Sequence, residues 1–183
     1  MLTIVILLIF VLSFYMGWRR GLIMQAIRFL GYIITFILAT QFFEPLSKWI
    51  EMIIPFPSIQ PDTQLAIYDE AISFMLDTAF YRVLTFMLIG LIGWLVTNYV
   101  SLFFNRLMYY DVLHHINRIG GGIINLIIAY IIVFIILFAL SLIPVEFIQQ
   151  QFVNNPLAYG IVANTPLLSD FAAQMWLSVN PLS

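Results

Sequence analysis

The chain contains no cysteine and very few charged residues. Without cysteine it can form no disulfide, no thiolate metal site and no cysteine nucleophile. Only 9% of its 183 residues are charged and 63% are hydrophobic, whereas soluble domains have about 25% charged and about 45–50% apolar residues. The composition therefore excludes an ordinary soluble domain, and the length is that of one domain.

Catalytic and nucleic-acid-binding motifs are also missing. The sequence contains no G-x-S-x-G, H-E-x-x-H or P-loop pattern and no extended basic tail. His114 and His115 follow Asp111 at helical spacing, but no fourth ligand is evident, so a solvated or head-group-facing pair is the favoured interpretation. We expect no enzymatic activity, no cofactor, no metal and no nucleic-acid partner.

Long apolar runs dominate the sequence that is present. There are four of them, at about residues 2–18, 22–43, 83–104 and 120–143. Each approaches or exceeds the ~20 residues that an α-helix needs to cross a bilayer. We predict an all-α integral membrane protein, with a four-helix bundle over residues 1–143 and an extracytoplasmic tail over residues 144–183.

The charged residues are segregated between the two sides of these spans. The proposed cytoplasmic side holds five basic residues and one acid, whereas segments 44–82 and 144–183 together hold two basic residues and eight acids. Lys and Arg collect on the cytoplasmic side of membrane proteins. Both termini should therefore be extracytoplasmic.

The acidic extracytoplasmic segment 44–82 has helical patterns of its own. Residues 45–54 form a short amphipathic stretch. Asp62 is a suitable N-cap for a second amphipathic helix that runs from Thr63 toward the third span.

The apolar tail also has a helical pattern. It resembles two or three short amphipathic helices broken at Pro156 and Pro166, because proline cannot continue a helix. Trp176 is a candidate anchor at the membrane interface, where Trp is enriched.

Each span carries a row of small or polar residues at four-residue spacing. Close approach through small residues helps helices to associate in lipid, where apolar burial contributes little. The rows are Ser13, Gly17 and Gly21; Gly31, Thr35 and Ala39; Gly93, Thr97 and Ser101; and Gly121, Asn125 and Ala129. They favour a compact bundle, and they leave open whether some rows face a second copy of the chain.

Three polar residues inside the spans form a candidate intramembrane site: Arg28, Asn98 and Asn125. An ionisable residue within a span is by default a functional-site hypothesis. Arg28 lies about seven residues into the second span, so snorkelling back to the head groups is the favoured interpretation. The two amides suit hydrogen bonds between helices, and the lining of a permeation path is the alternative.

The gap between the first two spans carries a sequence signature. It contains Gly17-Trp18-Arg19-Arg20-Gly21-Leu22, with Gln25 after it. This segment resembles the G-x-x-R-G signature of the colicin V production protein (CvpA) family. On this match Gly17, Arg20, Gly21 and Gln25 occupy family positions.

A second signature opens the last span. It reads Asn117-Arg118-Ile119-Gly120-Gly121-Gly122, and Asn125 follows. The family has an acidic residue or Asn, then Arg, then glycines four residues apart, so Asn117, Arg118 and Gly121 match. Asn117 stands where Asp is common, and Asn125 replaces the second glycine.

The resemblance covers about residues 1–143, and the acidic segment and apolar tail are similar to those of Gram-positive members. It implies a multi-pass protein of the bacterial plasma membrane that assists toxin or bacteriocin production or export and envelope homeostasis. Two alternatives stay open: an oligomeric channel or small-solute transporter, and a membrane anchor for a separate extracytoplasmic enzyme.

Expected partners follow from the charge pattern and the family. They are a second copy of the chain or an envelope protein, and the anionic lipid head groups that face Arg19, Arg20, Arg106 and Arg118.

Overall fold

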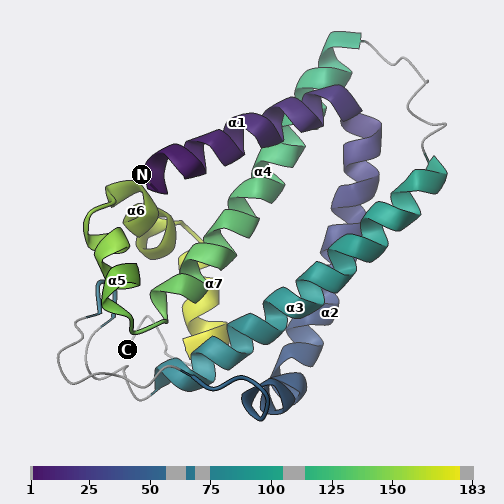
Figure 1. The fold of residues 1–183 in the computed structure, drawn as a ribbon. Coiled ribbons are helices and arrows are strands. Elements are labelled where there is room, and N and C mark those ends of the chain that lie inside the picture. Colours follow the sequence, from purple (N-terminus) through teal and green to yellow (C-terminus); the bar gives the residue numbers. More distant parts are fainter. Residues whose placement is uncertain (1, 57–64, 69–74, 105–113, 178–183) are drawn as a thin grey trace. The chain divides into compact units, whose positions relative to one another are not determined.

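The described residues of the chain fold mostly into helices. The structure is a computed structural model that describes residues 2–56, 65–68, 75–104 and 114–177. Its elements are α1 (Leu2–Arg20), α2 (Leu22–Glu51), α3 (Leu76–Ser101), α4 (His114–Ser141), α5 (Glu146–Val153), α6 (Pro156–Asn164), α7 (Leu168–Ala172) and the short π-helix η3 (Ala173–Leu177) (Figure 1). No strand occurs in these ranges, and the predicted all-α class is confirmed.

Helices α1 to α4 are long and apolar enough to cross a membrane. Their large apolar side chains are widely exposed; Ile4 and Val11 of α1, for example, are each 66% exposed. A helix that is hydrophobic on all sides is stable at a surface only where that surface meets lipid. Four helices therefore match the four predicted spans in length and hydropathy, and the protein is an integral membrane protein.

All four helices extend beyond the predicted spans at one end. Helix α2 continues through Pro45 to Glu51, so the predicted separate stretch at 45–54 is instead largely the end of α2. A proline inside a helix lacks an N–H donor and crowds the preceding turn. The chain tolerates it here, and the Ser47 hydroxyl donates to the Glu44 carbonyl at 2.8 Å in the same turn. Helix α3 begins at Leu76, seven residues before the predicted span.

Contacts divide the chain into two compact units. Unit 1 comprises residues 1–3, 43–86 and 134–183, and unit 2 comprises residues 4–42 and 87–133. Helices α1 to α4 each contribute residues to both units, because their sequences cross the unit boundaries. The two family signatures lie entirely in unit 2.

The core of unit 1 contains an aromatic cluster. Trp176 of η3 is only 2% exposed. The centre of its ring lies 5.2 Å from the ring centre of Phe86 and 5.2 Å from that of Phe138. Trp176 is therefore a core residue and not the exposed interfacial anchor that the sequence suggests. The predicted breaks at Pro156 and Pro166 are confirmed, since Pro156 begins α6 and Pro166 lies between α6 and α7.

The segment 65–68 of unit 1 is not helical, contrary to the helix predicted from Thr63. The proposed cap Asp62 and that helix's first residues lie outside the described residues. Side-chain hydrogen bonds to α4 and to the tail hold this segment in place of helical bonds. The Ala66 N–H donates to the Gln149 Oε1 atom at 2.9 Å, and the Tyr68 hydroxyl lies 3.0 Å from the Ser141 hydroxyl.

Candidate functional site

The two signatures meet where α1 crosses α4 in unit 2. Gly17 and Gly121 are both buried and face each other. A Cβ atom added to Gly121 would lie 2.6 Å from the Gly17 carbonyl oxygen, and one added to Gly17 would lie 2.6 Å from the Cβ of Asn125. Contacts this short are not available to any residue larger than glycine, so the backbones of α1 and α4 approach each other directly.

The other two glycines of the second signature also contact the hairpin formed by α1 and α2. A Cβ atom on Gly120 would lie 2.9 Å from the Cδ1 of Leu22, and one on Gly122 would lie 2.7 Å from a ring carbon of Phe14. The three consecutive glycines therefore accept the backbone of α1 and two large side chains. These contacts of all three glycines were not predicted, although the run of three glycines in the sequence could have indicated them.

Gly21 forms the one-residue connection between α1 and α2. Its φ is +77°, in the left-handed region that glycine adopts without a steric penalty. Its N–H donates to the Gly17 carbonyl at 3.0 Å, and its own carbonyl accepts from the Gln25 N–H at 3.1 Å. The G-x-x-R-G signature thus ends one helix and begins the next.

Asn117 caps α2 from a different helix. Its Oδ1 accepts a hydrogen bond from the Leu22 N–H at 2.7 Å, and its amide carbon lies 3.3 Å from the position of a Cβ on Gly21. The first N–H groups of a helix lack partners within the helix and need an acceptor from elsewhere. An Asp at this position, which the family resemblance suggests is common, would present the same acceptor oxygen.

Asn125 joins three helices through its side-chain amide. It accepts from the Gln25 Nε2 at 2.6 Å and donates from its Nδ2 to the Ser13 carbonyl at 2.5 Å. Gln25 is fully buried. The second glycine that the family pattern would place here is absent, and a hydrogen-bonded amide occupies the position. We call Gly17, Gly21, Gln25, Asn117, Gly121 and Asn125 the signature cluster.

Arg28 lies outside this cluster, between α2 and α3. Its guanidinium is buried, with 9% of the residue exposed, and Nη2 donates to the Ser101 hydroxyl at 3.1 Å. Its Nε and Nη1 atoms are buried without a hydrogen-bond partner in the described part of the chain. Asn98 donates to the Trp94 carbonyl of its own helix at 2.7 Å. The three residues of the predicted intramembrane site therefore have separate partners.

The arginines of the two signatures lie at the surface of unit 2. Arg118 is exposed and Arg20 is partly exposed. Arg19 is exposed too, and its guanidinium carbon lies 6.0 Å from the centre of the Tyr15 ring. The glycines and amides beside Arg20 and Arg118 make the close contacts and hydrogen bonds of the signature cluster.

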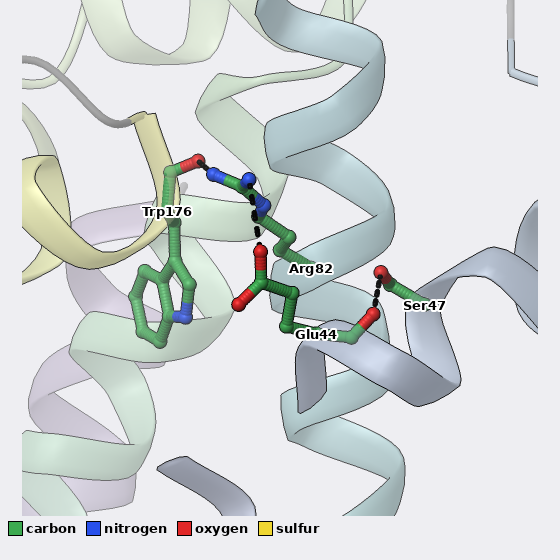
Figure 2. Close-up of polar contacts among 4 residues, drawn as sticks. All are labelled: Glu44, Ser47, Arg82 and Trp176. Carbon is green, nitrogen blue, oxygen red and sulfur yellow. Dashed lines mark hydrogen bonds and ion pairs between the residues drawn. The ribbon is translucent and has the colours of Figure 1, made fainter. Parts of the chain in front are cut away.

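Unit 1 contains a polar contact that the sequence did not predict (Figure 2). Arg82 Nη2 lies 3.8 Å from Glu44 Oε1, and Arg82 Nη1 donates to the Trp176 carbonyl at 3.3 Å. Because Glu44 is 68% exposed, the ion pair itself adds little stability. The hydrogen bond instead ties η3 to α3. The sequence feature that could have indicated this contact is the position of the two charges: Glu44 directly follows the second predicted span, and Arg82 directly precedes the third.

The signature cluster consists of glycines and amides, without a carboxylate, imidazole or hydroxyl nucleophile. Its chemistry is therefore hydrogen bonding and close packing. Among residues 2–56, 65–68, 75–104 and 114–177 there is no group of three His, Cys, Asp or Glu side chains that could hold a metal. The weak metal hypothesis at Asp111, His114 and His115 falls on side chains outside the described set.

Comparison with known proteins agrees with these signatures. The model of the family described as colicin V production protein matches residues 2–166. A relative in Bacillus subtilis (strain 168), described as "Uncharacterized transmembrane protein YshB", is 26% identical over 179 residues, which are 96% of this chain and 97% of the relative. No solved structure matches. Since the family model covers most of the chain, the protein belongs to the colicin V production protein family.

Proposed function

We propose that the protein is a non-enzymatic scaffold of the bacterial plasma membrane that assists toxin or bacteriocin export and envelope homeostasis. The observation that supports this proposal best is the signature cluster. The residues that match the family pattern pack helices and cap them, through the Gly17–Gly121 contact and the Asn117 bond to Leu22. Residues of the family pattern that hold helices together keep the arrangement of those helices fixed. This suits a protein that presents a fixed surface to a partner.

The proposed orientation has both termini outside the cell. Five of the seven basic residues then fall on the cytoplasmic side, as the positive-inside rule requires. In this orientation Arg19, Arg20, Arg106 and Arg118 meet anionic head groups, which attract Lys and Arg by about 1 kcal/mol each.

In-cell crosslinking followed by mass spectrometry tests the scaffold proposal. The wild-type chain should capture a specific envelope or export protein, and Gly121→Leu should lose both that capture and complementation of a deletion strain. Gly90→Leu is the matched control, because a Cβ atom at Gly90 meets nothing within 4 Å. Capture of an extracytoplasmic enzyme through residues 44–56 would favour the anchor alternative. Full complementation by Gly121→Leu at normal protein levels would contradict the proposal.

A channel or small-solute transporter is the second candidate, because unit 2 buries polar side chains. Gln25 is fully buried and its Oε1 has no hydrogen-bond partner in the described chain, which is unusual in a membrane protein without a polar path. Solute flux in proteoliposomes that disappears with Asn125→Leu and persists with Asn98→Leu would favour this function. Absence of flux in the wild-type protein would favour the scaffold.

A further inference from the structure

Helices α2 and α3 of unit 2 pack as an antiparallel pair with small residues between them. A Cβ atom on Gly31 would lie 2.6 Å from the Cγ2 of Thr97, and one on Gly93 would lie 2.7 Å from the Cβ of Thr35. The next pair along the same seam is Arg28 with Ser101, which are joined by a hydrogen bond. The guanidinium therefore belongs to the seam and closes one end of it.

An apolar groove of about 360 Å³ follows this seam. Among its lining residues are Ile27, Ile34 and Leu38 from α2 and Ile92, Val96 and Val100 from α3. Ile34 is 60% exposed and Ile92 is 62% exposed, so the groove reaches the surface of unit 2. The Thr35 hydroxyl donates to the Gly31 carbonyl at 2.9 Å, which satisfies it within its own helix and keeps the groove apolar.

The groove has the length of one lipid chain. From Ile27 to Leu38 it follows α2 for about 17 Å, at a rise of ~1.5 Å per residue. The hydrocarbon core of a bilayer is ~30 Å thick, so this length corresponds to one leaflet. A groove of this kind in a span is filled by an acyl chain or by another helix.

The charge at the end of the groove selects between these occupants. Arg28 is adjacent to Ile27, the first lining residue on α2, and Ser101 directly follows Val100, the last on α3, so the guanidinium lies at one end of the groove. Arg28 is nine-tenths buried, and two of its nitrogens have no partner in the described chain. Unit 2 contains five arginines but a single acid, Asp111, which lies outside the described residues. A bulky anion carried on an apolar chain complements this arrangement.

We propose that the α2–α3 groove binds one acyl chain of an anionic phospholipid and that Arg28 holds the phosphate of that lipid. Arginine is suited to this role because its planar fork of N–H donors matches phosphate oxygens, and a rotation of the side chain away from Ser101 presents it to the head group. The site requires neither the proposed orientation nor the scaffold function, so it can fail or succeed independently of them.

The direct test uses the unaltered full-length protein in nanodiscs. Phosphatidylglycerol with a photoactivatable group on one acyl chain should crosslink to residues in 27–38 and 89–100, and phosphatidylcholine with the same chain should do so at least tenfold less. A tenfold difference corresponds to about 1.4 kcal/mol of binding free energy. Equal labelling by the two lipids, or labelling confined to other helices, would overturn the proposal.

Two sets of variants test the contribution of the Arg28 charge and that of the apolar groove separately. Arg28→Gln should remove the preference for phosphatidylglycerol, whereas Lys48→Gln, which removes an equal charge from an exposed position, should keep it. Val96→Trp should fill the groove and abolish labelling by both lipids, and Val11→Trp, at an exposed position on α1, is its control.

Two further outcomes identify other occupants, and each contradicts the proposal. Competition by free inorganic phosphate at millimolar concentration would show that Arg28 binds the anion without the acyl chain. Crosslinks between two copies of the chain through residues 27–38, together with loss of lipid labelling in the dimer, would show that a second copy covers the groove. Retention of the phosphatidylglycerol preference by a folded Arg28→Gln protein would also refute it.

Discussion

At the scale of the residue, the signature cluster depends on glycines, which have no side chain, as much as on the amide side chains of Asn and Gln. Gly17, Gly21 and Gly121 each occupy a place where a side chain would meet the backbone or side chain of another helix. Sequence reasoning identified all three as family positions and as members of small-residue rows. It could not say which row each faces, because every span carries such a row.

Gly21→Ala should destabilise the protein more than any other glycine-to-alanine change at a helix end. The left-handed conformation costs an L-residue about 1–2 kcal/mol, and the Asn117 side chain lies within 3.0–3.3 Å of the new Cβ. Thermal unfolding in detergent, followed by circular dichroism, measures this loss. Gly90→Ala is the control and should unfold at the wild-type temperature or above it, because its helix interior gains from alanine. Equal midpoints for the two variants would refute the role of Gly21.

Tyr68 should make unit 1 sensitive to alkaline pH. Burial raises the pKa of Tyr68 above its usual value, and the hydrogen bond to Ser141 opposes this shift only in part. The Ser141 hydroxyl donates to the Phe138 carbonyl at 2.7 Å, so the neutral Tyr68 hydroxyl is the donor to Ser141.

The sign of the pH effect follows from this raised pKa. Because the folded pKa exceeds the unfolded value of about 10, the stability contributed by neutral Tyr68 is fully present below pH 10. It is lost as the pH rises from about 10 toward the folded value. Unfolding midpoints between pH 8 and 11 should fall more steeply for the wild type than for Tyr68→Phe. Parallel curves would show that the hydroxyl is not buried in the folded protein.

At the scale of the element, the structure departs from local signals in two places. The sequence predicts a span that ends at residue 43 and a separate stretch over residues 45–54, yet α2 continues through Pro45 to Glu51. Residues 65–68 have a helical pattern, yet hydrogen bonds to Gln149 and Ser141 hold them in a bent conformation. The tail helices, in contrast, break where their prolines predict: Pro156 stands in the first turn of α6, where a missing N–H is tolerated, and Pro166 lies between α6 and α7.

Trp176→Ala should loosen the tail from the rest of unit 1. The change removes a ring that packs on Phe86 and Phe138, and loss of a buried aromatic side chain costs about 3–5 kcal/mol. Hydrogen exchange should accelerate in α5 to η3 and leave residues 13–25 of unit 2 unchanged. Trp49→Ala, at a position 64% exposed, is the matched control and should alter neither region. Hydrogen exchange in the tail of the Trp176→Ala protein at the wild-type rate would contradict the role of Trp176 in holding the tail to the rest of unit 1.

At the scale of the whole molecule, charge and hydropathy act together to place the chain in a membrane. The four spans could be predicted from the sequence because a helix satisfies its own backbone groups and needs only sufficient apolar length to cross lipid. The orientation is a prediction of the same kind, and it depends on a few arginines.

Replacing Arg19 and Arg20 by Glu should disturb the orientation or the insertion of the chain. The change moves the balance of the proposed cytoplasmic side from four net positive charges to zero, counting five basic residues and one acid before it and three of each after it. A reporter fused to the C-terminus should then shift, wholly or in part, from an extracytoplasmic to a cytoplasmic location. Arg82→Glu, on the opposite side, should not produce this shift. An unchanged reporter in the double variant would refute the role of the arginine pair.

The sequence by itself determined the all-α class, the four spans and the family. These depend on composition, on the length of apolar runs and on local signatures, all of which can be read without knowing which residues are in contact. The tertiary structure alone decided which small residues meet, since four equivalent rows allow many pairings and only one lets Asn117 cap α2 while Asn125 joins α1, α2 and α4. It also decided the burial of Trp176 and of Arg28, because burial depends on which neighbours a side chain has and not on its own hydropathy.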